Sequence, residues 1–255
     1  MNEITERLWK YSILLSNIST YRYTTLMAKE LKDNTSGLNR REIVLSSRSP
    51  RRRSIIQLLD ISTKLFDPED QEDAPEELEC PQTYVNRISL RKAQQAISIF
   101  PDAVIIGVDT TVTLDNTIFR KPKTPAHALS MLETLKHRTH NVITGITTID
   151  ARLNRVLTSS TTTKVTMRKY SSQEMSAYIS SGDTFDKAGG YAIQDDIFNP
   201  VKEFRGCYLN VVGLPLCEIP PIMSELGATT YIKPNWTGLA QCYNCPLKSE
   251  NGATK

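Results

Sequence analysis

Serine and arginine side chains cluster where a predicted strand gives way to a predicted helix, in the segment 43–59, which reads IVLSSRSPRRRSIIQLL. Ser49 suits a helix N-cap and Pro50 the first helical position, where a missing N–H costs nothing. The helix would begin with unsatisfied N–H groups beside hydroxyls and the guanidinium groups of Arg51–Arg53, a combination that binds phosphate. A solvated basic helix start is the alternative that these residues leave open.

Carboxylates near strand ends are the second set of candidate chemical groups. Asp109 follows the apolar run 103–108, AVIIGV, which is typical of a strand in the middle of a covered sheet. Ligands of open α/β sheets bind at the carboxyl ends of such strands, although a capping or turn aspartate has the same sequence context. The acidic stretch 67–79 follows another predicted strand, 61–66, so one or two of its carboxylates could hold a divalent cation while most would be solvated.

Lysines beside predicted turns complete the candidate set. A tight hairpin at Asp115-Asn116 places Lys121 just past a strand end. Lys187 precedes Gly189-Gly190, where the backbone can approach a ligand closely. Both lysines are therefore candidates for binding an anionic ligand.

Residues that favour transition metals are sparse. His137 and His140 have no further metal-ligand residues nearby in the sequence, so we interpret both as structural. Cys242 and Cys245 form a lone CxxC near the end of the chain, without the second pair that a zinc site needs. These two cysteines are either reduced thiols or part of a metal site shared between chains.

Size and composition predict an ordinary globular protein. The chain has 255 residues, 39% hydrophobic and 23% charged, which suffices for one large α/β domain or two small ones. A net charge of +3 is too small to favour nucleic acid as the main partner, and no apolar run has the length of a membrane helix. Acidic residues within 1–34 argue against a mitochondrial presequence, and five scattered cysteines fit reduced thiols, so we expect a cytoplasmic location.

Strands and helices alternate along most of the chain. Strands are predicted at 43–45, 61–66, 103–108, 112–114, 117–119, 140–150, 156–168 and 208–212, and helices at 50–60, 82–100, 125–135, 172–180 and 219–226. An N-terminal extension, 1–41, could form two amphipathic helices, and residues 227–255 read as a polar, loose tail.

An ordered set of motifs points to a known family. The motifs are LSSRSPRRR, the acidic segment, GVDTTV, RKP, HRTHNVITG, DKAGGYAIQ and VVGLPL. Over residues 43–218 this set resembles the Maf family of nucleoside triphosphate pyrophosphatases, and we place the Maf-like domain at 42–226. The resemblance implies a Maf/ITPase-like, two-lobed α/β fold with a long mixed β-sheet, flanking helices and a deep central cleft. It also implies hydrolysis of nucleoside triphosphates between the α and β phosphates, with Mg²⁺ or Mn²⁺ as a divalent cofactor.

The resemblance assigns roles residue by residue. The substrate-binding positions are Ser46, Ser49, Arg51 and Arg52 of the phosphate-binding loop, with Lys187 and Gln194 of the DKAG…Q segment. The catalytic positions are Asp109 as general base, Glu69, Lys92 and Lys121, and the predicted metal ligands are Glu69 and Asp109. Cations would neutralise the triphosphate and the departing pyrophosphate, while a carboxylate or the metal readies a water molecule for attack.

Three residues favour one branch of the family. Family members that prefer methylated guanosine triphosphates usually have Trp at the position of Arg51, and Cys and Glu near Lys187 and Gln194, so this chain resembles the dTTP/UTP branch. Departures from the family pattern occur at Pro68, Ala192 and Asp195. A carboxylate at Asp195, beside Gln194, could alter the substrate preference.

The functional expectation is a house-cleaning pyrophosphatase that acts on dTTP, UTP or modified pyrimidine nucleotides. Its partner would be the nucleoside triphosphate substrate, with no nucleic acid and no membrane, and a homodimer is a possible assembly. The alternative is a non-catalytic nucleotide-binding regulator of cell division, a role to which the family has also been linked. The presence of Glu69, Asp109 and Lys121 favours the enzyme.

Overall fold

The structure, a computed structural model, describes residues 42–69, 73–228, 230–233 and 240–242. Contacts divide the chain into Met1–Ser36 and Gly37–Lys255, so every described residue belongs to the second unit. The helices predicted in the extension, and Cys245, lie outside the described residues. None of the helices in the described part has both the length and the apolar character that crossing a membrane requires.

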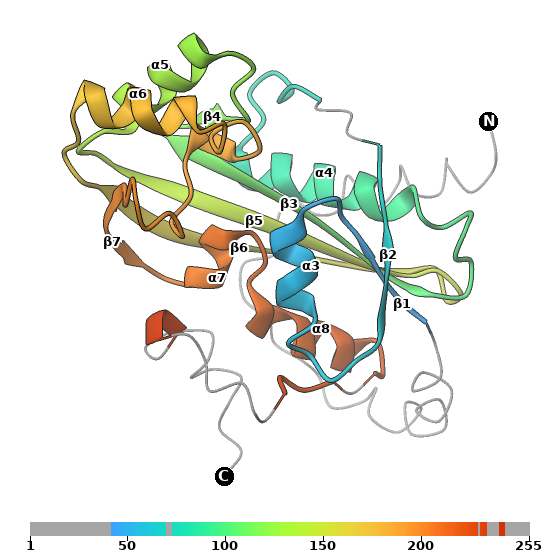
Figure 1. Cartoon of the computed structure of the whole chain (residues 1–255). Coiled ribbons are helices and arrows are strands. Elements are labelled where there is room, and N and C mark those ends of the chain that lie inside the picture. The colour runs from blue at the N-terminus through green and yellow to red at the C-terminus, as the bar shows by residue number, and fades with distance from the viewer. Residues whose placement is uncertain (1–41, 70–72, 229, 234–239, 243–255) are drawn as a thin grey trace. The chain divides into compact units, whose positions relative to one another are not determined.

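One mixed β-sheet forms the centre of the described fold (Figure 1). Its strands are β1 (Ile43–Ser46), β2 (Thr63–Phe66), β3 (Val104–Leu114), β4 (Thr117–Phe119), β5 (Thr139–Asp150), β6 (Arg155–Met167) and β7 (Val201–Arg205). The strand order is β2-β1-β3-β5-β6-β7, and β4 pairs with β3. β1 is parallel to β2 and β3, whereas the remaining pairs are antiparallel. The predicted α/β class with a long mixed sheet is therefore confirmed.

Helices cover both faces of the sheet. They are α3 (Pro50–Ile56), α4 (Pro81–Gln94), α5 (Pro125–Leu135), α6 (Ser172–Ser180), α7 (Tyr208–Val212) and α8 (Ile219–Glu225), with short 3₁₀ turns η2 (Ala188–Gly190), η3 (Leu216–Glu218) and η4 (Ala240–Cys242). On one face α3, α7 and α8 pack around Val108, while α5 and α6 pack around Val112 of the same strand. α4 packs on Ile105 and Ile143 of the opposite face. Two separate apolar clusters on one face give the fold its two lobes.

Local sequence signals account for the helix starts and for the tight hairpin. The hydroxyl of Ser49 accepts the N–H of Arg52 at 3.5 Å, and Thr124 caps α5 in the same way. Ser171 and Glu174 form the capping box at the start of α6, as their spacing predicts. Asp115-Asn116 have φ values of +50° and +64°, the left-handed conformation that a two-residue hairpin turn requires.

Several elements differ from the sequence prediction. The run 208–212 is the helix α7 and not a strand, because Cys207 Sγ accepts the N–H of Asn210 and Gly213 ends the turn at φ +126°. A short apolar run has no periodicity that separates these two states. β7 was not predicted, and the two strands predicted at 103–108 and 112–114 form the single strand β3, which runs from Val104 to Leu114.

The beginning of the predicted tail packs against the core. Ala228 and Thr230 are buried, and Ile232 forms an antiparallel bridge with Leu59. Asp60 accepts hydrogen bonds from the Tyr231 N–H at 2.7 Å and the Thr230 hydroxyl at 2.8 Å. The expectation of a loose chain from residue 227 onward is therefore wrong for residues 228 and 230–233.

A buried histidine makes stability depend on pH. His140 Nε2 lies 2.6 Å from the Tyr191 hydroxyl, and burial lowers the pKa of His140 from 6.5 to about 4. The unfolded chain therefore binds the proton first as pH falls, so stability is lost between about pH 6.5 and pH 4. With about 1.4 kcal/mol per pKa unit, the expected loss from this residue is roughly 3 kcal/mol.

Urea unfolding at a series of pH values measures this loss. His140→Gln should show a smaller fall in unfolding free energy over this range than the wild type. Tyr191→Phe removes the hydrogen bond but keeps the buried imidazole, so it should retain the fall. Equal pH dependence in the wild type and His140→Gln would contradict the assignment.

Candidate active site

A pocket of about 350 Å³ lies beside an open stretch of the β3 edge. On this edge β1 pairs with β3 as far as Gly107, and β4 pairs with it from Val112 onward. In the described part of the chain, residues 108–111 have no strand beside them on that edge, and Asp109, Thr110 and Thr111 line the pocket. We call residues 108–111 the open edge of β3.

Asp109 does not end its own strand, which corrects the sequence prediction. It lies near the middle of β3, opposite Gly145 of β5. The strand that ends here is the parallel neighbour β1, whose last residue, Ser46, is paired with Gly107. Asp109 is therefore exposed to the pocket because the neighbouring strand stops, in agreement with the general position of ligand sites in α/β sheets.

Most of the predicted site residues come together in this pocket. Those that line it are Ser49, Arg51, Arg52, Lys92, Asp109, Lys121, Lys187 and Gln194. Ser46 is instead fully buried, and its hydroxyl donates to the carbonyl of Lys92 at 2.6 Å. Glu69 is exposed and does not line the pocket, although the adjacent Pro68 does.

Lys92 and Asp109 form an ion pair at the wall of the pocket. The ammonium of Lys92 on α4 lies 2.6 Å from Asp109 Oδ1, and the two side chains are 15% and 14% exposed. α4 can approach β3 this closely because position 107 is glycine: a Cβ there would lie 2.1 Å from the Ser89 carbonyl oxygen. The carboxylate is thus held at the pocket by a cation from a different element.

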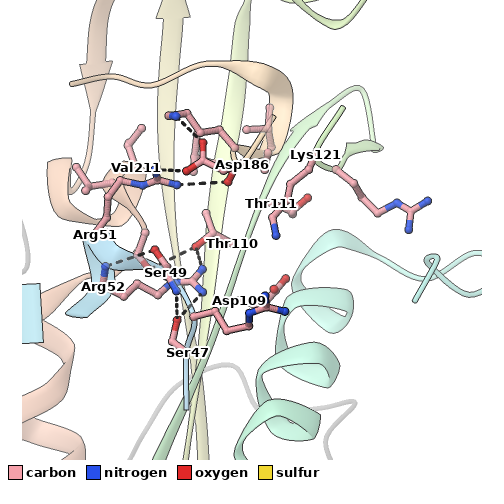
Figure 2. Close-up of a pocket in the computed structure, with 18 of the residues that line it drawn as sticks. Ser47, Ser49, Arg51, Arg52, Asp109, Thr110, Thr111, Lys121, Asp186 and Val211 are labelled. Carbon is pink, nitrogen blue, oxygen red and sulfur yellow. Dashed lines mark hydrogen bonds and ion pairs between the residues drawn. The ribbon is translucent and has the colours of Figure 1, made fainter. Parts of the chain in front are cut away.

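A second ion pair joins α3 to the DKAGG segment. Asp186 Oδ2 lies 2.9 Å from Arg51 Nη1, and Asp186 Oδ1 lies 2.5 Å from Lys187 Nζ (Figure 2). Burial raises the pKa of Asp186, but the hydrogen bonds and positive charges of Lys187 and Arg51 outweigh it and hold the pKa below its ordinary value. Asp186 therefore holds two of the predicted phosphate-binding cations on the same side of the pocket.

Arg52 points in a different direction from Arg51 (Figure 2). Its guanidinium donates to the carbonyls of Gly213 and Val108, at 2.8 and 3.0 Å, and to the hydroxyls of Thr110 and Ser47, at 2.8 and 3.4 Å. The two arginines are neighbours in sequence, yet one pairs with a carboxylate across the pocket and the other holds the strand and loops that line it.

Arginines of α4 organise the acidic segment. Arg87 makes two hydrogen bonds to the carboxylate of Glu79, at 2.7 and 2.6 Å, and Arg91 pairs with Asp73, which lines the pocket. Among the described residues, no group of three or more His, Cys, Asp or Glu side chains is arranged to hold a metal ion. The acidic segment is thus partly fixed by ion pairs and is not simply a solvated loop.

Several pocket residues were missed in the sequence. These are Thr110, Arg120, Asp186, Tyr191 and Gly213, all from the motifs that carry the family resemblance. Their position inside the motifs was the available signal, but motif membership alone does not separate pocket residues from packing residues. Asp195, in contrast, was singled out in the sequence but does not line the pocket. Its carboxylate accepts hydrogen bonds from the N–H groups of Ile197 and Phe198, at 3.1 and 2.6 Å.

Comparisons with known proteins show the family to which the chain belongs. The family model described as Maf-like protein matches residues 42–226. The dTTP/UTP pyrophosphatase of Syntrophus aciditrophicus is 35% identical over 190 residues, which cover 74% of this chain and 92% of that protein. The dTTP/UTP pyrophosphatase of Dictyoglomus turgidum is 37% identical over 188 residues, 74% of this chain and 97% of that protein. A protein of the same name from Dehalococcoides mccartyi strain BAV1 is 34% identical over 217 residues, 85% and 96% respectively.

Proposed function

Because the chain belongs to the Maf-like protein family, we propose that it hydrolyses nucleoside triphosphates, dTTP and UTP foremost, to a monophosphate and pyrophosphate. The relatives that support this proposal carry the name dTTP/UTP pyrophosphatase. The observation that carries it is one pocket lined both by Asp109 and by cations from separate segments of the chain. Those cations are Arg51, Lys92, Lys121 and Lys187.

The phosphate groups bind where α3 begins. Arg51 and Lys187 neutralise the outer phosphates, and Lys121, from the segment after β4, neutralises charge from the other side of the pocket. Ser49, the N-cap residue of this helix, lines the same region of the pocket. Charge that develops on the departing pyrophosphate is stabilised by these cations in the transition state.

Asp109 accepts the proton of the attacking water. A carboxylate acts as a general base when it is held within reach of the attacking water, and the ion pair with Lys92 at 2.6 Å holds Asp109 at the pocket wall. The open edge of β3 exposes this carboxylate to the pocket rather than to a neighbouring strand. Lys92 thus orients the base and belongs to the same site.

A divalent cation, Mg²⁺ or Mn²⁺, is part of the proposal. The donor chemistry fits, since Mg²⁺ in nucleotide enzymes is usually held by one or two carboxylates together with phosphate oxygens of the substrate, and Asp109 supplies a carboxylate in the pocket. When bound, the cation lowers the pKa of water and neutralises phosphate charge. Glu69 stays a prediction as the second metal ligand.

Product analysis with a panel of nucleotides tests the proposed function. We expect pyrophosphate and a monophosphate from dTTP and UTP, with slower turnover of dCTP, dGTP and methylated guanosine triphosphates. A chelator should abolish the release, and added Mg²⁺ or Mn²⁺ should restore it. Release of inorganic phosphate in place of pyrophosphate would contradict the proposed bond cleavage.

Light scattering on the same preparation tests the predicted homodimer.

Substitutions of Arg51 and Lys187 should act on substrate binding. Because a hydrogen bond to a charged group contributes about 1.5–3 kcal/mol, Arg51→Gln and Lys187→Gln should each raise KM by about tenfold or more. Arg138→Gln is the matched control, since the Arg138 side chain pairs with the exposed Asp115 and does not line the pocket. A KM like that of the wild type in Arg51→Gln would exclude the assigned contact.

A further inference from the structure

The environment of Arg52 suggests a different role from that of the neighbouring Arg51. Arg52 is partly buried, and the acceptors of its guanidinium are the carbonyls of Val108 and Gly213 and the hydroxyls of Ser47 and Thr110. Four hydrogen bonds to four separate residues, at 2.8 to 3.4 Å, spread the positive charge over uncharged protein groups. A side chain committed in this way is already fixed by the protein before any phosphate is considered.

Two of these acceptors lie on either side of Asp109. Arg52 Nη1 binds the carbonyl of Val108 at 3.0 Å, and Arg52 Nη2 binds the hydroxyl of Thr110 at 2.8 Å. The Val108 carbonyl belongs to the planar peptide unit that leads into Asp109, so a fixed carbonyl also fixes the start of that residue. Arg52 therefore donates hydrogen bonds to the open edge of β3, beyond the last residue of β1.

The same contacts extend into the interior of the protein. The Thr110 hydroxyl lies 2.9 Å from that of Thr144, which in turn donates to the carbonyl of Asn210 at 3.1 Å. Asn210 is fully buried, and its amide donates to Val142 and Thr163 at 3.0 and 2.9 Å. A connected, buried network of this kind holds its members in one geometry.

We infer that Arg52 is a positioning residue. Its hydrogen bonds hold the open edge of β3, where no described strand is paired, and thereby fix Asp109 toward the substrate. The inference rests on the proposed function only for its kinetic consequences. Lysine cannot replace the guanidinium here, because a single ammonium lacks the planar fork that reaches several acceptors at once. Arg51, which donates to the carboxylate and the carbonyl of Asp186, provides the contrasting neighbour.

Three substitutions test this role in the full-length protein. Arg52→Lys keeps the charge, Arg52→Gln removes it, and Thr110→Val removes one acceptor while leaving the arginine in place. We expect kcat for dTTP to fall about 10- to 100-fold in both Arg52 variants and less in Thr110→Val, since a small misplacement of a catalytic group costs that much. Affinity for a dTTP analogue with a methylene group between the α and β phosphates should change by less than about threefold.

Amide hydrogen exchange supplies a readout that does not depend on turnover. Peptides covering residues 104–114 should exchange faster in Arg52→Lys and Thr110→Val than in the wild type, whereas Arg51→Gln should leave them unchanged and weaken analogue binding. Strong loss of analogue binding in Arg52→Gln, with unaltered exchange in all these variants, would overturn the inference and make Arg52 a phosphate ligand. If the wild type released no pyrophosphate, the proposed function would fail while the exchange experiment still decided the positioning role.

Discussion

Asp109→Asn should lower the rate of pyrophosphate release from dTTP by about 10²- to 10⁴-fold, the usual contribution of a general base. The carboxylate lines the pocket and lies 2.6 Å from the Lys92 ammonium, so the substitution removes the proton acceptor at its reacting position. Asparagine has nearly the same shape, and the strand should keep its pairing with β5 on the other edge. Initial rates at saturating nucleotide and metal measure the effect.

Nucleotide binding separates loss of chemistry from loss of the site. Calorimetry with the α,β-methylene analogue of dTTP should give an affinity for Asp109→Asn close to that of the wild type when metal is omitted. Lys121→Gln is the matched comparison, since it should weaken binding by removing a phosphate contact. Turnover by Asp109→Asn at the wild-type rate would remove Asp109 from its assigned role, and a protein that binds but never releases pyrophosphate would be a regulator and not an enzyme.

Gly107→Ala should be among the most destabilising single substitutions in the described part of the protein. The added Cβ would lie 2.1 Å from the Ser89 carbonyl oxygen and 2.7 Å from the Ala93 nitrogen, both of which belong to the backbone of α4. Because neither atom is the end of a flexible side chain, α4 itself must move away from β3. Overpacking of this kind costs about 3 kcal/mol, equivalent to roughly 6–12 °C in melting temperature for a domain of this size.

The same substitution should also impair catalysis in the folded fraction. Lys92 lies on α4, so a displaced helix carries the ammonium away from Asp109. Gly145→Ala on β5 is a graded comparison, because its Cβ would lie 2.8 Å from the Val85 backbone and the Asn86 side chain of α4, a smaller overlap than at Gly107 that should cost less stability. Thermal melting and kcat below the melting range test both statements, and a Gly107→Ala protein as stable as the wild type would show that the helix is not held by this contact.

Much of the fold follows from local sequence. Ser49 and Ser171 mark helix starts because their hydroxyls satisfy N–H groups within the same turn, and Asp115-Asn116 mark a hairpin because few other residues adopt a positive φ. These interactions involve residues close together in the chain, so their spacing is visible in the sequence. Residues 208–212 show the limit, since the Cys207 cap that makes them helical is a weak signal and the run is too short for periodicity to decide.

The candidate site shows the same distinction between features that are visible in the sequence and features that depend on packing. The side chains available for the chemistry can be identified from the sequence, because the residue types of Asp109, Lys92 and Lys187 and the order of their motifs are properties of the chain. What each side chain contacts depends on how the chain packs. Arg51 and Arg52 are adjacent and chemically identical, yet Arg51 pairs with Asp186 and Arg52 donates hydrogen bonds to the open edge of β3. Asp186 lies 135 residues from Arg51 in the chain, and Val108 lies 56 residues from Arg52, so only tertiary packing brings these groups within hydrogen-bonding distance.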